Sequence, residues 1–403
     1  MMDRARETAA SMTRRTLQRL LLVAVPFTLV VVGLVLSTSG GCAHVLPRLV
    51  PVAGFKQVET RLIILGDAGA PAVPKDPVLE AARKDAARDP AHTTLLFLGD
   101  NVYPRGLVRE GDPYRAEMER RLDAQLAVGR DSGAALTLFT PGNHDWDAWG
   151  PGGWAAIKRE GAFILEKGGG RAALEPEQGC PGPAVRDVGP RLRLVLLDTQ
   201  WWLHAYDKPR DPTSSCPQDS DTEVLDALEA AITSAGDRFV VVAAHHPLAT
   251  GGMHGGYFGW QDHIFPLRSR KSWLWIPLPG LGSIYPWARR TGVSDQDLGG
   301  VRNRKMREAF EGVFAKHAPL IYAAGHDHNL QVLAGKDAKY LLVSGAGYYG
   351  HVSRTVWTNE TLFAQEASGY MTLEIEATGP PRLGVVTVQA DGKASEVYSA
   401  SLQ

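Results

Sequence analysis

Five apolar, β-rich stretches of this chain each end directly in a short polar motif. In chain order, the motifs carry Asp67, Asp100, Asn143, His245 and His326. Ligands of α/β proteins collect just beyond the carboxyl ends of the strands. Five motifs in that position can therefore converge on one crevice, although they lie far apart in the sequence.

The rest of the chain alternates strand-like and helix-like stretches, which predicts an α/β protein. The last predicted strands have no long helix between them, so we expect an antiparallel edge or a second sheet there. The predicted strands are 61–65, 93–98, 136–140, 192–197, 239–243, 320–323, 340–343, 370–375, 383–388 and 396–400, and the predicted helices are 77–88, 114–128, 223–234 and 302–317.

Composition indicates a globular protein with a sizeable core. The 403 residues are 44% hydrophobic and 22% charged, and the formal net charge is -1. Such a balance is ordinary for a soluble domain. It provides no overall field that would recruit nucleic acid, so we expect no nucleic-acid partner.

The first 45 residues read as an export signal. Arg14, Arg15 and Arg19 precede an uncharged apolar run at 20–36, which small residues and Cys42 follow. This order is typical of a secretory signal, and the paired arginines also resemble a twin-arginine signal. A lipid anchor on Cys42, an uncleaved single-helix anchor and secretion remain alternatives. The flanking arginines argue against a buried helix of the globular domain.

We therefore predict two parts, a signal or anchor at 1–45 and one enzyme domain at 46–403. The expected location is the periplasm or cell envelope. Apart from Cys42, the chain has only Cys180 and Cys216. An even pair in an oxidising compartment predicts one disulfide, with two free thiols as the alternative.

The polar motifs offer the donors that a two-metal site needs. Hard cations prefer oxygen ligands, and imidazole suits zinc and iron. Two metals about 3.5–4 Å apart need about as many ligands as the motifs supply, with one carboxylate shared. Each motif is weak alone, but the ordered set predicts a dinuclear centre. The candidate ligands are Asp67, Asp100, Tyr103, Asn143, His245, His326 and His328.

The ordered motifs GDAG, GDNVY, GNHD, AHHP and GHDH resemble those of the calcineurin-like metallophosphoesterases. Two departures from the general pattern make the chain most similar to the purple acid phosphatases, and among them to the small tartrate-resistant enzymes. Gly69 stands where most of the superfamily has His, and Tyr103 is the additional ligand of the purple enzymes. The resemblance implies a four-layer αββα sandwich of two mixed sheets, with the metals at the carboxyl ends of the strands.

The resemblance also implies how the ligands divide between the ions. A ferric ion would take Asp67, Asp100, Tyr103 and His328, and a divalent iron, zinc or manganese ion would take Asp100, Asn143, His245 and His326. His246 falls beside the site rather than among the ligands.

Two more histidines match positions that bind phosphate and help to protonate the leaving group in this family. They are His144 and His254, and a His beside metals and phosphate can act as a general acid. Asp145 and Asn329 are expected to orient ligands. For His351, approach to the site through the loop that follows Ser344 is an alternative to a position without a functional partner.

The expected activity is hydrolysis of small phosphate monoesters, in which a metal-bound hydroxide attacks phosphorus in line. Phosphodiesterase or nucleotidase activity at the same site is the alternative, and a non-catalytic phosphate-binding metalloprotein is a third interpretation. An insertion at 257–300, rich in Trp and Arg, separates two of the metal motifs. It is interpreted as a self-packed surface loop, a lid or a patch that touches a membrane.

Overall fold

The computed structural model describes residues 58–212, 214–269 and 273–403. The predicted signal or anchor at 1–45, with Cys42, lies outside the described residues. Among the residues that are described, no helix combines the length and the apolar character needed to cross a bilayer.

The described residues contain fourteen strands in two sheets of seven, each with a parallel centre and antiparallel additions. In the first sheet β1, β2, β3 and β4 are parallel, and β12, β13 and β14 continue it antiparallel on the other side of β1. The order of this sheet is β14 (Ala394–Ser401), β13 (Arg382–Val388), β12 (Gly369–Glu376), β1 (Val58–Leu65), β2 (Thr93–Phe97), β3 (Leu136–Phe139) and β4 (Ala172–Leu174).

The second sheet repeats this plan. Here β6, β7, β8 and β10 are parallel, whereas β5, β9 and β11 pair antiparallel. Its order is β11 (Thr361–Gln365), β9 (Leu330–Ala334), β10 (Tyr340–Ser344), β8 (Ile321–Ala324), β7 (Phe239–Ala243), β6 (Leu192–Leu196) and β5 (Ala184–Val188).

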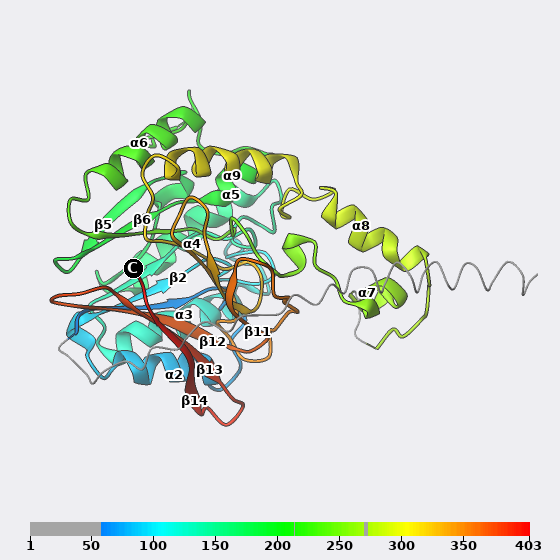
Figure 1. Cartoon of the computed structure of the whole chain (residues 1–403), viewed down its shortest axis with the longest axis horizontal. Coiled ribbons are helices and arrows are strands. Elements are labelled where there is room, and N and C mark those ends of the chain that lie inside the picture. The colour runs from blue at the N-terminus through cyan, green and yellow to red at the C-terminus, as the bar shows by residue number, and fades with distance from the viewer. Residues whose placement is uncertain (1–57, 213, 270–272) are drawn as a thin grey trace, which may run out of the picture. The chain divides into compact units, whose positions relative to one another are not determined.

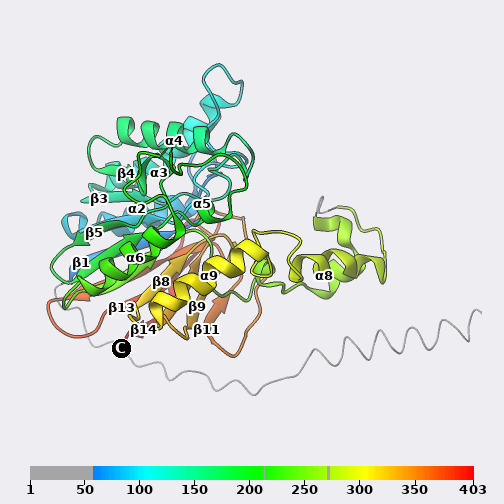
Figure 2. The ribbon, with the colours of Figure 1, turned by 90° about the horizontal axis from the view of Figure 1, so that it is seen from above.

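The apolar side chains of each sheet alternate between the core that lies between the two sheets and a core under the helices. The described elements therefore form four layers (Figures 1 and 2). Leu62 and Ile64 of β1 face the second sheet and join a core with Leu194 and Val241. Residues on the opposite faces pack against helices, because successive side chains of a strand point to opposite sides. The predicted αββα sandwich is confirmed.

In the part of the chain that the structure describes, three helices cover the first sheet and two cover the second. The helices α2 (Pro77–Ala86), α3 (Arg115–Ser132) and α4 (Gly153–Lys167) share a core with β1, β2 and β3, whereas α6 (Asp221–Thr233) and α9 (Val301–Phe314) share one with β6, β7 and β8.

Local signals fix where these helices begin. The Asp76 side chain accepts hydrogen bonds from two backbone N–H groups of the first turn of α2, and Pro77 starts that helix. Ser220 and Glu223 form a capping box at the start of α6. Each arrangement satisfies backbone donors that the first turn leaves without a partner.

Cys180 and Cys216 form the predicted disulfide, with their Cα atoms 5.6 Å apart. The bond joins the segment before β5 to the segment before α6, so it ties together two connections that no strand pairing holds.

Replacing Cys180 by Ser should lower the free energy of unfolding by about 2–4 kcal/mol, since the bond closes a loop with a sequence separation of 36. Denaturant titration of wild type and variant measures the difference. Reducing agent should weaken the wild type to the level of the variant and leave the variant unchanged. Equal stability of both proteins under oxidising conditions would contradict the prediction.

The predicted insertion folds as an excursion between β7 and α9. It contains the short helices α7 (Trp260–Ile264) and α8 (Ile284–Arg290). Figures 1 and 2 show both helices to one side of the sandwich, so the segment projects from the body rather than covering it.

Candidate metal centre

The predicted ligands follow neighbouring parallel strands of both sheets. Asp67, Asp100 and Asn143 follow β1, β2 and β3, and His245 and His326 follow β7 and β8. Carboxyl ends of parallel strands lie at the same edge of a sheet, and the two sheets are stacked. The fold therefore brings all five motifs to one end of the sandwich.

One group of ligand atoms surrounds a carboxylate oxygen of Asp67. The Tyr103 hydroxyl donates to this Oδ1 at 3.0 Å, and His328 Nε2 lies 3.4 Å from it. The Tyr103 oxygen and His328 Nε2 are themselves 3.2 Å apart. The second oxygen of Asp67 accepts the backbone N–H of His326 at 2.7 Å, which fixes the direction of the carboxylate.

A second group surrounds His245 Nε2. Asn143 Oδ1 lies 2.8 Å from this nitrogen and His326 Nδ1 lies 3.1 Å from it. His245 Nδ1 donates to the Leu98 carbonyl oxygen at 2.8 Å, and His326 Nε2 donates to the carbonyl oxygen of Gln296 at 2.8 Å. With His245 Nδ1 and His326 Nε2 protonated, the two nitrogens that face each other, His245 Nε2 and His326 Nδ1, carry lone pairs.

Asp100 lies between the two groups. Its Oδ1 is 3.4 Å from His245 Nε2 and accepts the backbone N–H of His144 at 2.8 Å. Ligand atoms of Asp67, Asp100 and His245 all lie within 4.8 Å of one another. The geometry brings the seven candidate ligands together in two groups with one carboxylate between them, and the assignment of ions to the groups stays a prediction.

Three of these residues adopt the left-handed backbone region that side chains other than Gly rarely enter. The φ angles are 57° at Asp67, 53° at Asp100 and 70° at His326. Each such residue costs roughly 1–3 kcal/mol, and such strain concentrates at functional sites. The turn after each strand therefore holds its ligand at the expense of local stability.

Gly69 and Tyr103 are in contact, and the packing at Gly69 is linked to the position of the Tyr103 side chain. A Cβ at Gly69 would lie 2.5 Å from the carbonyl oxygen of Asp100, so no side chain fits at position 69. The Gly69 carbonyl oxygen accepts the backbone N–H of Tyr103 at 3.1 Å, and the Tyr103 hydroxyl reaches Asp67. The loop that excludes a His at position 69 thus supplies the phenol instead.

The buried donors fit bound cations. Burial raises the pKa of Asp67 to about 7, and the neighbouring Asp100 adds to the rise. Burial lowers the pKa of His328 to about 4 and that of His326 well below the usual range. Neutral imidazoles crowded against two buried carboxylates leave negative charge and lone pairs facing one another, a set that metal ions satisfy.

His144 borders the first group. Its Nδ1 donates to the carbonyl oxygen of Pro104 at 2.6 Å, and its Nε2 lies 3.9 Å from Asp100 Oδ2. The ring packs edge-on against Tyr103 with centroids 4.6 Å apart. The His144 side chain is partly exposed, and its Nε2 is the ring nitrogen that the Pro104 carbonyl does not engage.

His254 borders the second group, with its ring 3.7 Å from that of His326. Its Nδ1 lies 2.8 Å from Asp297 Oδ1, a carboxylate that also pairs with Arg289. Burial alone would lower the pKa of His254, but the hydrogen bond to Asp297 and the charges of Asp327 and Asp297 raise it overall.

Gln296 and Asp297 were not foreseen from the sequence, although they hold three histidines. The Gln296 carbonyl oxygen binds His326, and its side-chain oxygen accepts from His246 Nε2 at 2.8 Å. Both residues belong to the inserted segment, which therefore contributes to the site. Asp297 lies 43 positions from His254, and no motif spacing links them.

His246 has its two ring nitrogens engaged away from the ligand groups, as expected of a neighbour of the site. Its Nδ1 bonds the Thr199 hydroxyl at 2.8 Å and its Nε2 bonds Gln296. His246 still lies close enough to His245 and His326 for the three rings to form a candidate metal-binding group. These two hydrogen bonds make it the weakest candidate ligand of the three.

Other residues named from the sequence surround the ligands. His351 stacks on His328 with ring centroids 3.7 Å apart, so the loop after β10 does bring it to the site. Asp145 accepts three backbone N–H groups from the Asp100 and Asn143 loops. Asn329 bonds the Gln331 side chain at 2.7 Å. Asp198 caps the short helix α5 (Thr199–Leu203) and is not part of either ligand group.

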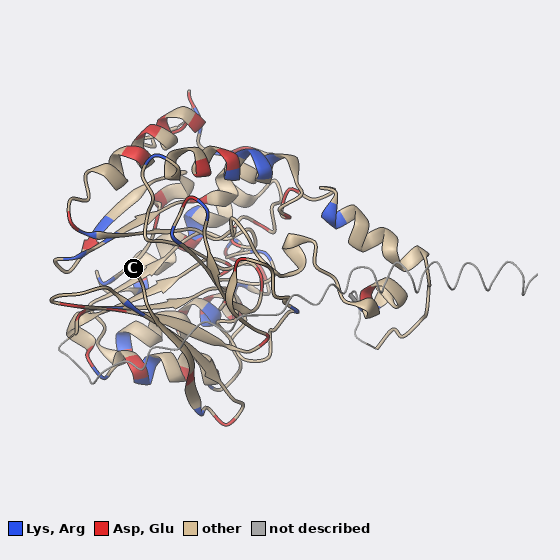
Figure 3. Ribbon diagram, in the orientation of Figure 1, with Lys and Arg blue, Asp and Glu red and all other residues tan. Residues whose placement is uncertain are grey.

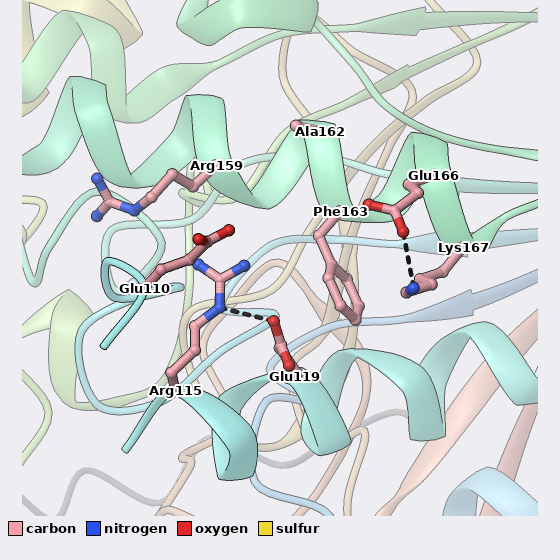
Figure 4. Close-up of a pocket in the computed structure, with 8 residues that line it drawn as sticks. All are labelled: Glu110, Arg115, Glu119, Arg159, Ala162, Phe163, Glu166 and Lys167. Atoms are coloured by element: carbon pink, nitrogen blue, oxygen red, sulfur yellow. Dashed lines mark hydrogen bonds and ion pairs between the residues drawn. The ribbon is translucent and has the colours of Figure 1, made fainter. Parts of the chain in front are cut away.

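Two cavities lie on the α3 and α4 side of the site. One of about 720 Å³ reaches Tyr103 and Pro104 and is lined by Arg105, Arg109 and Arg159 among others. The other, of about 480 Å³, contains none of the motif residues (Figure 4). There Arg115 pairs with Glu119, and Lys167 with Glu166. These paired charges leave little field for an anion.

No family model matches the chain, and no curated protein matches it in sequence. Solved structures match its fold. A purple acid phosphatase isolated from yellow lupin (Lupinus luteus) seeds matches with a TM-score of 0.51 and 15% identity, over 87% of this chain and 55% of that one. GAP50, the anchor in the inner membrane complex of Plasmodium, gives 0.49 and 16% over 86% and 89%. A dimetal phosphatase from Danio rerio gives 0.45 and 14% over 86% and 99%.

The likeness to the lupin structure concerns the fold alone. At this level of identity it shows that the described residues share the fold of that solved structure. What the chain does must be argued from its own side chains.

Proposed function

We propose that this protein hydrolyses phosphate monoesters at a dinuclear metal centre. The observation that carries the proposal is the meeting of metal-binding atoms around His245 Nε2, where Asn143 Oδ1 and His326 Nδ1 lie at 2.8 and 3.1 Å. The second nitrogen of each imidazole is bonded to a backbone carbonyl. This is how proteins orient histidines that bind metals.

Two ions, Fe³⁺ and a divalent Fe, Zn or Mn ion, would polarise the phosphoryl oxygens and lower the pKa of a bound water. Asp67, Tyr103 and His328 would hold the first, and Asn143, His245 and His326 the second. Asp100 would contact both. The metallophosphoesterase-type fold, which the lupin purple acid phosphatase shares, supports this division.

The two outer histidines would act on the substrate. His144 would bind a phosphoryl oxygen through Nε2, because its Nδ1 is bonded to Pro104. Asp297 holds His254 Nδ1, so Nε2 is the ring atom available to give a proton to the departing alkoxide. The cavity beside Tyr103 offers room for the organic part of the ester.

The test is phosphate release from an aryl phosphate by the purified, metal-loaded protein. Comparison with an aryl phosphodiester separates the proposal from its alternative, because a monoesterase releases product faster from the monoester. A faster rate on the diester would replace the proposal by phosphodiesterase activity. Tight phosphate and metal binding without turnover of either ester would make the protein a phosphate-binding metalloprotein.

Tyr103→Phe should abolish visible colour. A phenolate bound to Fe³⁺ gives a charge-transfer absorption band, and Phe has no oxygen to bind the ion. The absorption spectrum and metal content of wild type and variant measure this. Tyr348→Phe is the matched control, since its ring lies 6.3 Å from that of Tyr103 and it is not among the ligands. An iron-free, colourless and active wild type would remove the assignment to the purple enzymes.

The protein is also proposed to act outside the cytoplasm. The disulfide between Cys180 and Cys216 supports this location, because such bonds persist in oxidising compartments. Whether residues 1–45 are a cleaved signal, a lipoprotein signal or a helix anchor would follow from the mass and the N-terminal residue of the mature protein.

A further inference from the structure

We infer that the segment 257–293 docks on the interfacial region of an anionic lipid bilayer. Half of the large apolar side chains that are exposed among the described residues lie in this short stretch. Trp273 and Trp287 are 68% and 67% exposed, and Leu281 is 65% exposed. Exposed apolar side chains gathered in one short stretch are typical of an interaction site. The exposed members are Tyr257, Trp260, Leu267, Trp273, Trp275, Ile276, Leu281, Ile284, Tyr285, Trp287 and Val293.

The described parts of the segment, 257–269 and 273–293, are folded, so their exposed rings are not the result of a missing core. Phe265 packs edge-on against Trp275 with centroids 5.2 Å apart, and Arg268 lies 3.8 Å above the Trp275 ring. The backbone N–H of Leu278 bonds the carbonyl oxygen of Ile264 at 2.7 Å. These contacts use one side of the segment, and Trp273 and Trp287 remain exposed.

The charge of the segment 257–293 indicates which kind of partner it binds. Five basic residues and one acidic residue lie between 257 and 293, although the whole chain has a net charge of -1. One of the five, Arg289, is neutralised by its ion pair with Asp297, so the segment retains four other basic residues against Asp262. Figure 3 shows α7 and α8 mostly uncoloured, with a basic turn at one end of α8. The basic residues are Arg268, Arg270, Lys271, Arg289 and Arg290, and the acidic one is Asp262.

Trp rings beside basic residues suit the headgroup layer of a membrane. Indole favours this layer because one part of the ring is apolar and its N–H can bond water or headgroups. Arg side chains extend to lipid phosphates and are attracted by anionic lipids. A second copy of the chain fits less well, because it would press two positively charged surfaces together.

The docked surface would remain connected to the metal centre. The backbone N–H of Leu298 bonds the carbonyl oxygen of His254 at 2.8 Å, and Arg289 pairs with Asp297. Both ends of the segment are thus fixed at the site. The inference concerns binding and does not depend on the proposed hydrolysis.

Quenching of Trp fluorescence by lipids with brominated acyl chains tests the inference on the full chain. All ten Trp residues follow residue 145, so residues 1–57 contribute no signal even if they bind lipid. We expect vesicles of phosphatidylcholine and phosphatidylglycerol to quench the fluorescence, and vesicles of phosphatidylcholine alone to quench it less. Arg290→Glu should reduce quenching on the anionic vesicles.

Two sets of Trp variants locate the contact. The double variant Trp273→Phe, Trp287→Phe should lose at least about half of the quenching, because it removes the most exposed indoles of the segment. Trp357→Phe, at an exposed ring outside the segment, should change it little. Unquenched wild type, or quenching that the double variant retains in full, would overturn the inference. A stable dimer that buries the segment and abolishes quenching would overturn it in favour of a second copy.

Discussion

Asp100→Asn should remove nearly all phosphate release and at least one bound metal ion. The carboxylate lies between the two ligand groups, 3.4 Å from His245 Nε2, and it is almost fully buried. An amide keeps the shape of the side chain but not the charge. Loss of a residue that only supports a ligand costs roughly 10–100-fold, so loss of a shared ligand should cost more than about 100-fold in kcat/KM.

The measurements are metal content by elemental analysis and kcat/KM on an aryl phosphate. Asp198→Asn is the matched control. Asp198 is also a buried carboxylate after a strand, but it accepts hydrogen bonds from Trp146 and Trp201 instead of facing the ligands. Its metal content should equal that of the wild type. Full metal content and full activity in Asp100→Asn would refute the dinuclear assignment. Normal metal content without activity would show that Asp100 is needed for hydrolysis but not for metal binding.

Sequence periodicity predicted the strands that lie at the centres of the two sheets. β7 and β8 are continuous apolar runs, and β1 and β2 end in such runs, because both faces of these strands are buried there. Four of the described strands were not predicted: β4 and β5, which lie at sheet edges, and β9 and β11, which pair with each other. β4 has only three residues, and β5 exposes Arg186 and Asp187 at the edge of the second sheet. The order of the strands in each sheet required the structure, since it depends on long-range packing.

The residues of the candidate site also fall into those that the sequence predicted and those that it did not. The motif ligands were readable because each lies within a few residues of the end of a strand. The supporting residues were not, because Gln296 and Asp297 reach the site from an insertion whose sequence has no strand or motif beside them. The structure thus changes the interpretation of this insertion, which contributes polar groups to the site at its end and exposes aromatic rings in its middle.

Asp297→Asn should lower kcat by about 10–100-fold and leave KM within about threefold of the wild type. Asp297 holds His254 Nδ1 at 2.8 Å, and partners that orient a functional His have effects of this size. An amide is a weaker acceptor and can turn its NH₂ group toward the ring, which would favour the wrong tautomer. The ligands themselves do not contact this carboxylate, so metal content should remain that of the wild type.

The dependence on the leaving group separates a positioning role from general damage. A proton from His254 matters most when the departing alkoxide is basic, so Asp297→Asn should slow an alkyl phosphate more than a nitrophenyl phosphate. Asp295→Asn is the control within the same segment, because Asp295 bonds the backbone N–H of Arg302 at 2.9 Å and is not bonded to His254. Equal losses on both esters in Asp297→Asn would show that the carboxylate serves the fold of the segment and not the proton transfer.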